Sequence, residues 1–323
     1  MGFEMSADKQ LTFFNLDTRE PEEPSCALAL AIGNFDGVHL GHRRLVMAAS
    51  DQAVQLSASL GEAACGVFCF LEPPADFLSK DPSPHIYTFE KKLELLHMAG
   101  AKYAVVGDFE SLRHLSAKDF AVLLRDSCHC RAVSCGFNFR FGQGGAGGEK
   151  DLREVFGDMV TVLDAVRSED GIPISSSRIR SLLHEGDIEK ANSFLGSPFT
   201  IEGEVIHGKA LGRRLGLPTL NQKFGNKMIV PKTGIYVSRV IVGNRSYRAV
   251  TNIGTRPTFE DSGEINCETH LLDFDGELYG EKIAVELLFR LRGEKKFASE
   301  KELCDTIEND IRMADKYFEE KAL

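Results

Sequence analysis

The chain has 323 residues, more than one hydrophobic core usually holds, so we predict two domains, residues 1–196 and 197–323. A net charge of −10 gives no electrostatic footprint for DNA or RNA, and we expect no nucleic-acid partner. No apolar run has the length of a membrane span and the first residues lack a signal-peptide pattern. We therefore expect a cytoplasmic protein without a membrane partner, and no obligate protein partner is evident.

The first part of the chain alternates short apolar runs with segments of helical spacing. We predict strands at residues 11–16, 26–32, 64–70, 103–107, 131–135 and 159–166. Helices are predicted at residues 43–56, 88–99, 149–156 and 187–195, and after Ser116 and Ser177. This alternation indicates a Rossmann-like parallel sheet covered on both faces. Ligands of such folds bind outside the carboxyl ends of the strands.

The segment that joins the second predicted strand to the next helix reads GNFDGVHLGH. Amide groups at a helix N-terminus favour a bound phosphate, and Gly33 and Gly41 permit a close backbone approach. His39 and His42 are three residues apart, so their side chains share one face if both lie in the first helical turn. A bare H-x-x-H spacing favours a zinc-like pair or two surface histidines, and the surrounding glycines reverse that preference.

This string resembles the H-x-G-H nucleotidyltransferase superfamily. More narrowly, it resembles the FAD synthetase module of bacterial riboflavin kinase/FMN adenylyltransferases. The resemblance implies ATP binding by Gly33, Phe35 and Gly41. It also implies catalytic roles for His39 and His42, which would steady the charge that develops on a leaving pyrophosphate.

Two later segments resemble the same family. Residues 136–142 resemble its G-x-[DN]-F-x-F-G element, which implies that Asn138 faces the nucleotide or flavin.

Residues 174–180 begin a helix. On local evidence alone, their hydroxyl groups are explained as well by helix capping as by ligand binding. Hydroxyls and arginines at a helix N-terminus also form an anion site. Resemblance to the element I-S-S-T-x-I-R implies that Arg180 neutralises the ATP phosphates, beside ATP-binding Ser175, Ser176 and Ser177.

The second part of the chain is rich in strand-like runs separated by turns that contain glycine. These runs lie at residues 200–206, 234–242, 246–253, 266–274 and 281–291. A long amphipathic segment follows at residues 299–318. We predict a small antiparallel β-barrel closed by a long helix.

Residues 203–221 contain four glycines and three basic residues, a composition that lets a backbone wrap around phosphates. The stretch resembles the riboflavin kinase signature, although Leu220 replaces the usual alanine of its last element. The resemblance implies that Thr219 and Asn221 hold Mg²⁺ through oxygen ligands suited to a hard cation. The ATP phosphates would bind at Gly208, Lys209, Gly212 and Arg213.

Glu268 is the candidate base of this second part. On a strand, Glu268 and His270 share a face while Thr269 points the other way. A carboxylate there can accept a hydroxyl proton during phosphoryl transfer, and the resemblance assigns this role to Glu268 with the terminal ribityl hydroxyl of riboflavin. Two further resemblances, at residues 252–259 and 291–297, imply flavin-binding residues Asn252, Arg256 and Arg292.

The resemblance therefore implies an enzyme that phosphorylates riboflavin and adenylylates FMN, with riboflavin, FMN and ATP as substrates and Mg²⁺ as cofactor. One departure keeps a rival open. The family shows Pro-His-Pro after an acidic residue, whereas Glu72 is followed by Pro73 and Pro74, and His85 lies too far along the chain for a simple substitute. The alternative is a riboflavin kinase with a degenerate, inactive or regulatory N-terminal domain. A nucleotidyltransferase of another substrate is disfavoured by the kinase-like signature.

Overall fold

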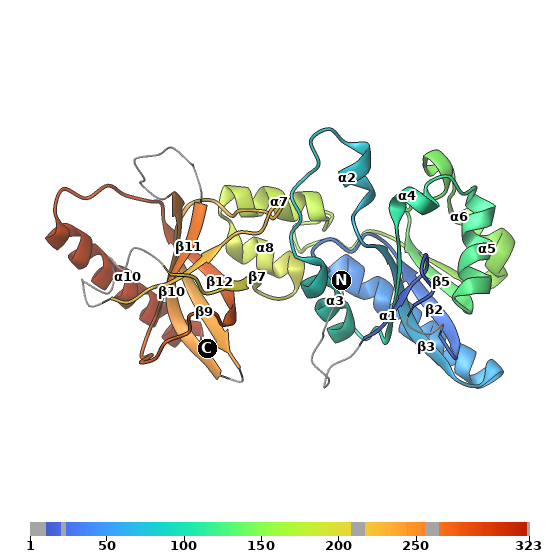
Figure 1. The fold of residues 1–323 in the computed structure, drawn as a ribbon, viewed down its shortest axis with the longest axis horizontal. Helices are drawn as coiled ribbons and strands as arrows, with labels where there is room; N and C mark the ends of the chain where they lie inside the picture. Colours follow the sequence, from blue (N-terminus) through green and yellow to red (C-terminus); the bar gives the residue numbers. More distant parts are fainter. Residues whose placement is uncertain (1–10, 21–23, 208–216, 244, 256–264, 322–323) are drawn as a thin grey trace. The chain divides into compact units, whose positions relative to one another are not determined.

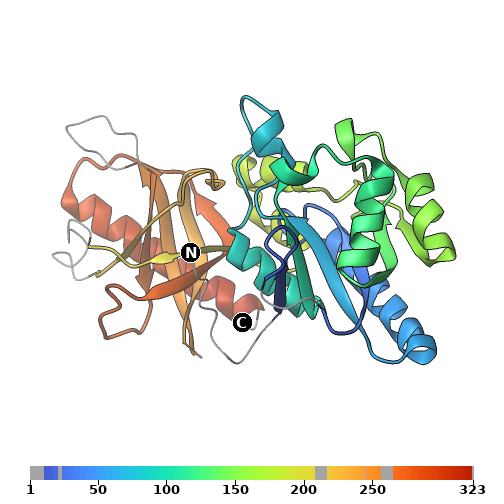
Figure 2. The same ribbon diagram turned by 45° about the vertical axis from the view of Figure 1, so that its right-hand side comes forward.

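The computed structural model describes residues 11–20, 24–207, 217–243, 245–255 and 265–321 (Figure 1, Figure 2). The chain divides into two compact units, Met1–Ser176 and Ser177–Leu323. This division precedes the predicted domain boundary between residues 196 and 197, because helix α8 (Ile188–Leu195) packs against strands of the second unit. The boundary itself stays a prediction.

A six-stranded parallel sheet forms the centre of the first unit, in the order β1-β4-β3-β2-β5-β6. The strands are β1 (Thr12–Asn15), β2 (Ala27–Ile32), β3 (Ala63–Phe70), β4 (Tyr103–Gly107), β5 (Cys130–Gly136) and β6 (Val160–Leu163). The predicted Rossmann-like sheet is confirmed.

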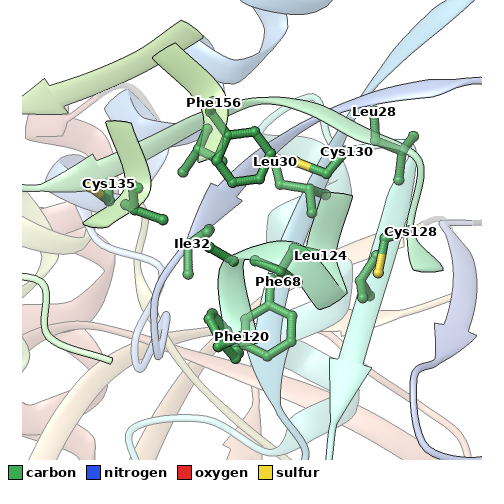
Figure 3. Close-up of a cluster of buried hydrophobic side chains, with 14 of the residues drawn as sticks. Leu28, Leu30, Ile32, Phe68, Phe120, Leu124, Cys128, Cys130, Cys135 and Phe156 are labelled. Carbon is green, nitrogen blue, oxygen red and sulfur yellow. The ribbon is translucent and has the colours of Figure 1, made fainter. Parts of the chain in front are cut away.

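Helices cover both faces of this sheet. The larger ones are α1 (Leu40–Leu60), α3 (Phe89–Met98), α5 (Ala117–Ser127) and α6 (Glu149–Phe156), and two short ones are α2 (Pro74–Leu78) and α4 (Phe109–Leu112). Alternate residues of β2 serve the two faces. Leu28, Leu30 and Ile32 join Leu124 of α5 and Phe156 of α6 in one buried cluster (Figure 3). The intervening alanines point the other way, where α1 packs on β2, β3 and β5.

The strand order reverses beside β2. The chain runs outward from β2 through β3 to β4 and then returns to β5 on the other side of β2. Because all these strands are parallel, the segments that follow β2, β3 and β5 emerge at one edge of the sheet. A crevice at such a reversal is the usual ligand site of an open α/β sheet. Both the histidine motif and Asn138 therefore lie at this edge.

An antiparallel six-stranded barrel forms most of the second unit, in the order β7-β12-β9-β10-β11-β8. The strands are β7 (Phe199–Glu204), β8 (Leu220–Lys223), β9 (Gly234–Val242), β10 (Arg245–Thr255), β11 (Ile265–Leu271) and β12 (Lys282–Arg292). The two outer strands meet, since Ile206 forms a bridge with Asn221 and the Gln222 side chain donates to the Gly203 carbonyl at 2.9 Å. The predicted barrel is confirmed.

Helix α10 (Glu300–Lys321) packs against β10 and β9 (Figure 1). Ala314 and Phe318 on its apolar face are buried against Val237, Val250 and Leu288 of the barrel. The long covering helix is therefore also as predicted. The unit continues N-terminally with α8 and with α7 (Ser176–Glu185).

Hydroxyl groups form a buried ladder on the other face of the barrel strands. The Thr251 hydroxyl lies 2.7 Å from that of Ser238 and 2.9 Å from that of Thr269. Since Thr269 is buried there, its neighbours Glu268 and His270 face the opposite side, as their alternation predicts.

Three local predictions need correction. Strand β8 was not predicted, because its polar sequence shows no alternation and its pairing is set by β11. The strand expected at residues 159–166 ends at Leu163, after which Arg167 and Pro173 form an isolated bridge across a turn. Helix α1 begins at Leu40 rather than at residue 43, because His39 caps it.

Candidate active sites

The two histidines of the first unit lie against each other at the start of α1. His39 is the N-cap, and its Nδ1 accepts a hydrogen bond from the His42 backbone N–H at 3.4 Å. The two imidazole rings stack with centroids 3.7 Å apart and an angle of 13° between their planes. The predicted shared face is confirmed. Because Nδ1 of His39 is an acceptor, its ring proton is on Nε2.

Burial keeps both imidazoles neutral. Desolvation lowers the pKa of His39 from the ordinary value of 6.5 to about 4, in keeping with its exposed fraction of 7%. The pKa of His42 falls well below 6.5, first through desolvation and then through repulsion from His39 and Lys92. Nδ1 of His42 is buried and has no hydrogen-bond partner in the described part of the chain. The pair thus offers hydrogen bonds rather than positive charge.

The loop before α1 holds an unusual backbone conformation. Phe35 and Val38 have positive φ angles of 52° and 41°, although neither is glycine and both are fully buried. A positive φ is costly for a β-branched residue and persists only where packing imposes it, often at functional sites. The Phe35 ring lies 5.2 Å from that of His42, edge to face. Packing of Phe35 therefore helps to fix the histidine pair.

Gly41 explains how the His39 ring can lie over the first turn of α1. A Cβ atom at this position would lie 3.1 Å from Cε1 and 3.2 Å from Nδ1 of His39. Alanine would therefore press on the ring of the N-cap residue. Gly33 has a similar relation to Phe35, whose ring would lie 3.4 Å from a Cβ atom there.

Asp36 connects this loop to two distant segments of the same unit. Its carbonyl accepts a hydrogen bond from the Ser176 hydroxyl at 2.7 Å, and its Oδ1 accepts one from the Ile86 N–H at 3.0 Å. The structure thus brings Ser176 to the histidine loop. Ser175 precedes it, Ser177 is exposed, and Arg180 lies one turn further along α7.

The link through Ile86 also places His85 next to a residue that contacts the loop. His85 Nε2 lies 3.1 Å from both carboxylate oxygens of Asp76 in α2. His85 therefore lies nearer to the Asp36 segment than its distance along the chain led us to expect. The residues around it come from the connection between β3 and α3, where the sequence departs from the family pattern.

Asn138 follows β5, the neighbour of β2, and its side chain is exposed. Of the three phenylalanines around it, Phe141 is buried in the core and stacks with Phe139 at 5.6 Å. Phe137 is 55% exposed. Core packing therefore accounts for Phe141 and leaves Phe137 at the surface near Asn138.

Lys92 of α3 is a charged group that the sequence reasoning missed. It is only 6% exposed, its Nζ donates to the Phe70 carbonyl at 3.3 Å, and Nζ lies 4.7 Å from the Phe89 ring centroid. Within the described residues it forms no ion pair, and its charge contributes to the lowered pKa of His42. A sequence signal existed, because Lys92 falls on the apolar face of its helix, at helical spacing from Phe89 and Leu96.

In the second unit, strand pairing gathers four of the predicted residues in one row. Glu268 of β11 lies opposite Asn221 of β8 on one side and Asn252 of β10 on the other. Asn252 in turn pairs with Ile235 of β9, which pairs with Arg292 of β12. Directly paired residues of antiparallel strands point to the same face. The row therefore presents a carboxylate, two amides and a guanidinium on the face that carries α10.

Arg292 is engaged by helix α10. Its Nε and one terminal nitrogen donate to the two carboxylate oxygens of Asp310 at 3.0 and 2.7 Å. This bidentate pair joins the end of β12 to α10. Arg292 thus anchors the helix at the end of the row.

Thr219 lies immediately before β8, and its carbonyl is 3.5 Å from Nδ2 of Asn221. The carbonyl oxygen of the preceding residue, Pro218, accepts a hydrogen bond from Nδ1 of His270 at 2.8 Å. The predicted metal ligands are therefore adjacent to the Glu268 strand. The remaining predicted residues lie outside the described residues: Gly208, Lys209, Gly212, Arg213 and Arg256.

A parallel α/β sheet with a histidine pair at its reversal point, joined to a small barrel with a carboxylate-amide row, defines a nucleotide-dependent transferase with two sites. Comparison with known sequences narrows the class. Residues 21–178 match the FAD synthetase family and residues 195–318 the riboflavin kinase family. The chain belongs to the bifunctional riboflavin kinase/FMN adenylyltransferase family.

Two relatives illustrate the match. The bifunctional riboflavin kinase/FMN adenylyltransferase of Bacillus subtilis is 35% identical over 92% of this chain and 94% of its own length. The protein of the same name from Escherichia coli K12 is 34% identical over 92% of this chain and 95% of its own. Among solved structures, a Streptococcus pneumoniae protein titled a macrolide-efflux protein is 28% identical, with a TM-score of 0.82, 94% of this chain and 98% of that chain covered. In the described part of the present chain, no helix has the length and apolar character needed to cross a membrane.

Proposed function

We propose that this chain phosphorylates riboflavin to FMN in its barrel unit and transfers AMP from ATP to FMN in its sheet unit, releasing pyrophosphate. It acts as a cytoplasmic enzyme on riboflavin, FMN and ATP. The observation that carries the proposal is the row that pairs Glu268 with Asn221 and Asn252, because polar side chains from three strands meet at one carboxylate.

In the kinase reaction, Glu268 accepts the proton of the terminal ribityl hydroxyl. The hydroxyl oxygen attacks the γ-phosphorus of ATP and ADP leaves, so no covalent enzyme intermediate is needed. Thr219 and Asn221 would hold Mg²⁺, since a hydroxyl and an amide oxygen are donors that a hard cation accepts. When bound, the ion supplies positive charge to the ATP phosphates.

In the adenylyl transfer, a phosphate oxygen of FMN attacks the α-phosphorus of ATP and pyrophosphate leaves. The neutral imidazoles of His39 and His42 donate hydrogen bonds to phosphate oxygens, while positive charge comes from Arg180 and Lys92. Groups held rigidly where charge develops stabilise the transition state without reorganisation. The strained loop serves this purpose by fixing the two rings, and the absence of a side chain at Gly41 leaves room for the His39 ring.

The proposal is tested by incubating the protein with riboflavin, ATP and Mg²⁺ and separating the flavins by chromatography. FAD is the expected product. FMN alone would support the alternative, a kinase with an inactive first unit. That alternative rests on the sequence Glu72-Pro73-Pro74, which lacks the family's histidine. Unchanged riboflavin would contradict both activities.

Two variants separate the sites. His42→Ala should abolish FAD formation from supplied FMN while riboflavin phosphorylation continues. Glu268→Gln should have the reverse effect. Each variant is the control for the other, because a general loss of folding would remove both activities together. FAD formation by His42→Ala at the wild-type rate would remove the assignment of the first site.

A further inference from the structure

Asn266 in β11 is a buried side chain whose hydrogen-bonding capacity is unused. The residue is 2% exposed, and neither Oδ1 nor Nδ2 of its amide has a partner within the described residues. Oδ1 of Asn252 in the neighbouring strand is also buried and unpaired. Buried amides almost always find partners within the protein, so an unpaired amide next to an unpaired amide oxygen on the adjacent strand indicates a ligand site.

Both amides lie beside Glu268. Asn266 precedes Glu268 by two residues on the same strand, so both point to the same face, about 7 Å apart. Asn252 is directly opposite Glu268 and therefore diagonal to Asn266. The three side chains form a compact polar group, in which Glu268 was predicted as the base and Asn252 as a flavin-binding residue, whereas Asn266 had no predicted role.

Asn266 pairs with Lys223 of β8 on one side and with Gly254 of β10 on the other, and Gly254 carries no side chain. A Cβ atom at Gly254 would overlap Oε1 of Glu294 and approach Nδ2 of Asn252 to 3.4 Å. The Glu294 carboxylate thus lies over β10 at Gly254. A side chain at residue 254 would displace the Glu294 carboxylate and press on the Asn252 amide.

We propose that Asn266, together with Asn252, binds the inner hydroxyls of the ribityl chain of riboflavin. The inference rests on the proposed kinase function, in which Glu268 faces the terminal hydroxyl. A polyol extends from that hydroxyl with one hydroxyl on each successive carbon, and every hydroxyl both donates and accepts. An amide with a free donor and a free acceptor matches such a chain. Asn266 is therefore a substrate-positioning and specificity residue.

The test compares two flavins that share the ring system. Riboflavin carries the polyol, whereas lumiflavin carries a methyl group in its place. Dissociation constants are measured by flavin fluorescence for the full-length wild type, Asn266→Leu and Asn266→Ala, with Mg²⁺ and a non-hydrolysable ATP analogue. The smaller alanine variant guards against overpacking by leucine. The control is Asn192→Leu, since both amide atoms of Asn192 are paired within the protein.

We expect riboflavin to bind about tenfold more weakly to both Asn266 variants, with lumiflavin unchanged. Without ligand, Asn266→Leu should melt at or up to about 4 °C above the wild type, because an unpaired buried amide is removed, whereas Asn192→Leu should melt lower. Equal weakening for both flavins would mean that the amide contacts the ring and would overturn the proposal. Unchanged riboflavin affinity with a lowered melting temperature would show a structural role instead. A wild type that neither binds nor phosphorylates riboflavin would remove the kinase proposal itself.

Discussion

The neutral state of His39 leads to a quantitative prediction about pH. The residue caps α1 through Nδ1, and burial lowers its pKa to about 4. The informative substitution is His39→Asn, because asparagine is also a favourable N-cap but does not titrate. The difference between wild type and variant therefore isolates the titration of one imidazole from the loss of the cap.

The magnitude follows from the pKa difference between the folded and unfolded states. That difference is about 2.5 units, from 6.5 to about 4, and each unit corresponds to about 1.4 kcal/mol. Because the folded pKa is the lower one, the unfolded chain binds the proton first as pH falls. The stability is fully present above pH 6.5 and decreases as pH falls towards 4. At pH 5 the loss attributable to His39 is about 2 kcal/mol, and it approaches about 3 kcal/mol at lower pH.

Two measurements check this. NMR titration of histidine-labelled protein should show the His39 ring changing near pH 4, with the signal assigned through its absence in His39→Asn. Hydrogen exchange of α1 amides, which reports on the first unit alone, should lose about 2 kcal/mol more in the wild type than in the variant between pH 7.5 and 5. A His39 midpoint between pH 6 and 7, or equal losses in both proteins, would refute the argument from burial.

Three further predictions concern other residues. Lys92→Met should slow FMN adenylylation about 10- to 100-fold, the effect of losing one charged hydrogen bond to phosphate, while riboflavin phosphorylation by the same sample is unchanged; equal rates in steady-state assays would exclude Lys92 from the site. Gly254→Ala should leave the melting temperature nearly unchanged, because the exposed Glu294 side chain can move aside. The KM for riboflavin should rise, because the added methyl group presses on the Asn252 amide, and an unaltered KM would contradict a substrate contact at Asn252. Asp310→Asn should destabilise the barrel unit by about 3 kcal/mol in urea unfolding, because Arg292 loses a bidentate partner that is almost fully buried. A loss below about 0.5 kcal/mol, as for an exposed pair, would show that this ion pair does not anchor α10.

Local sequence patterns determined most of the secondary structure. The apolar run before Gly33 predicts β2, and apolar residues at helical spacing after residue 299 predict α10. Both predictions depend only on periodicity and turn residues within the segment itself. The same locality identified the histidine pair, since residues three apart at a helix start share a face whatever surrounds them. Where the signal was not local, as for the polar strand β8, the prediction failed.

The protonation of the histidines and the make-up of the second site depended on tertiary structure. Desolvation of His39 and His42 depends on what packs over them, including Lys92 from a helix outside their motif. Glu268 meets Asn221 and Asn252 only because antiparallel register aligns three separate strands, and a shift of one residue would turn each side chain to the other face. The sequence by itself therefore determined which chemical groups are present and on which elements. The tertiary structure decided their charge states, their partners and, at Asn266, an amide that the protein leaves unpaired.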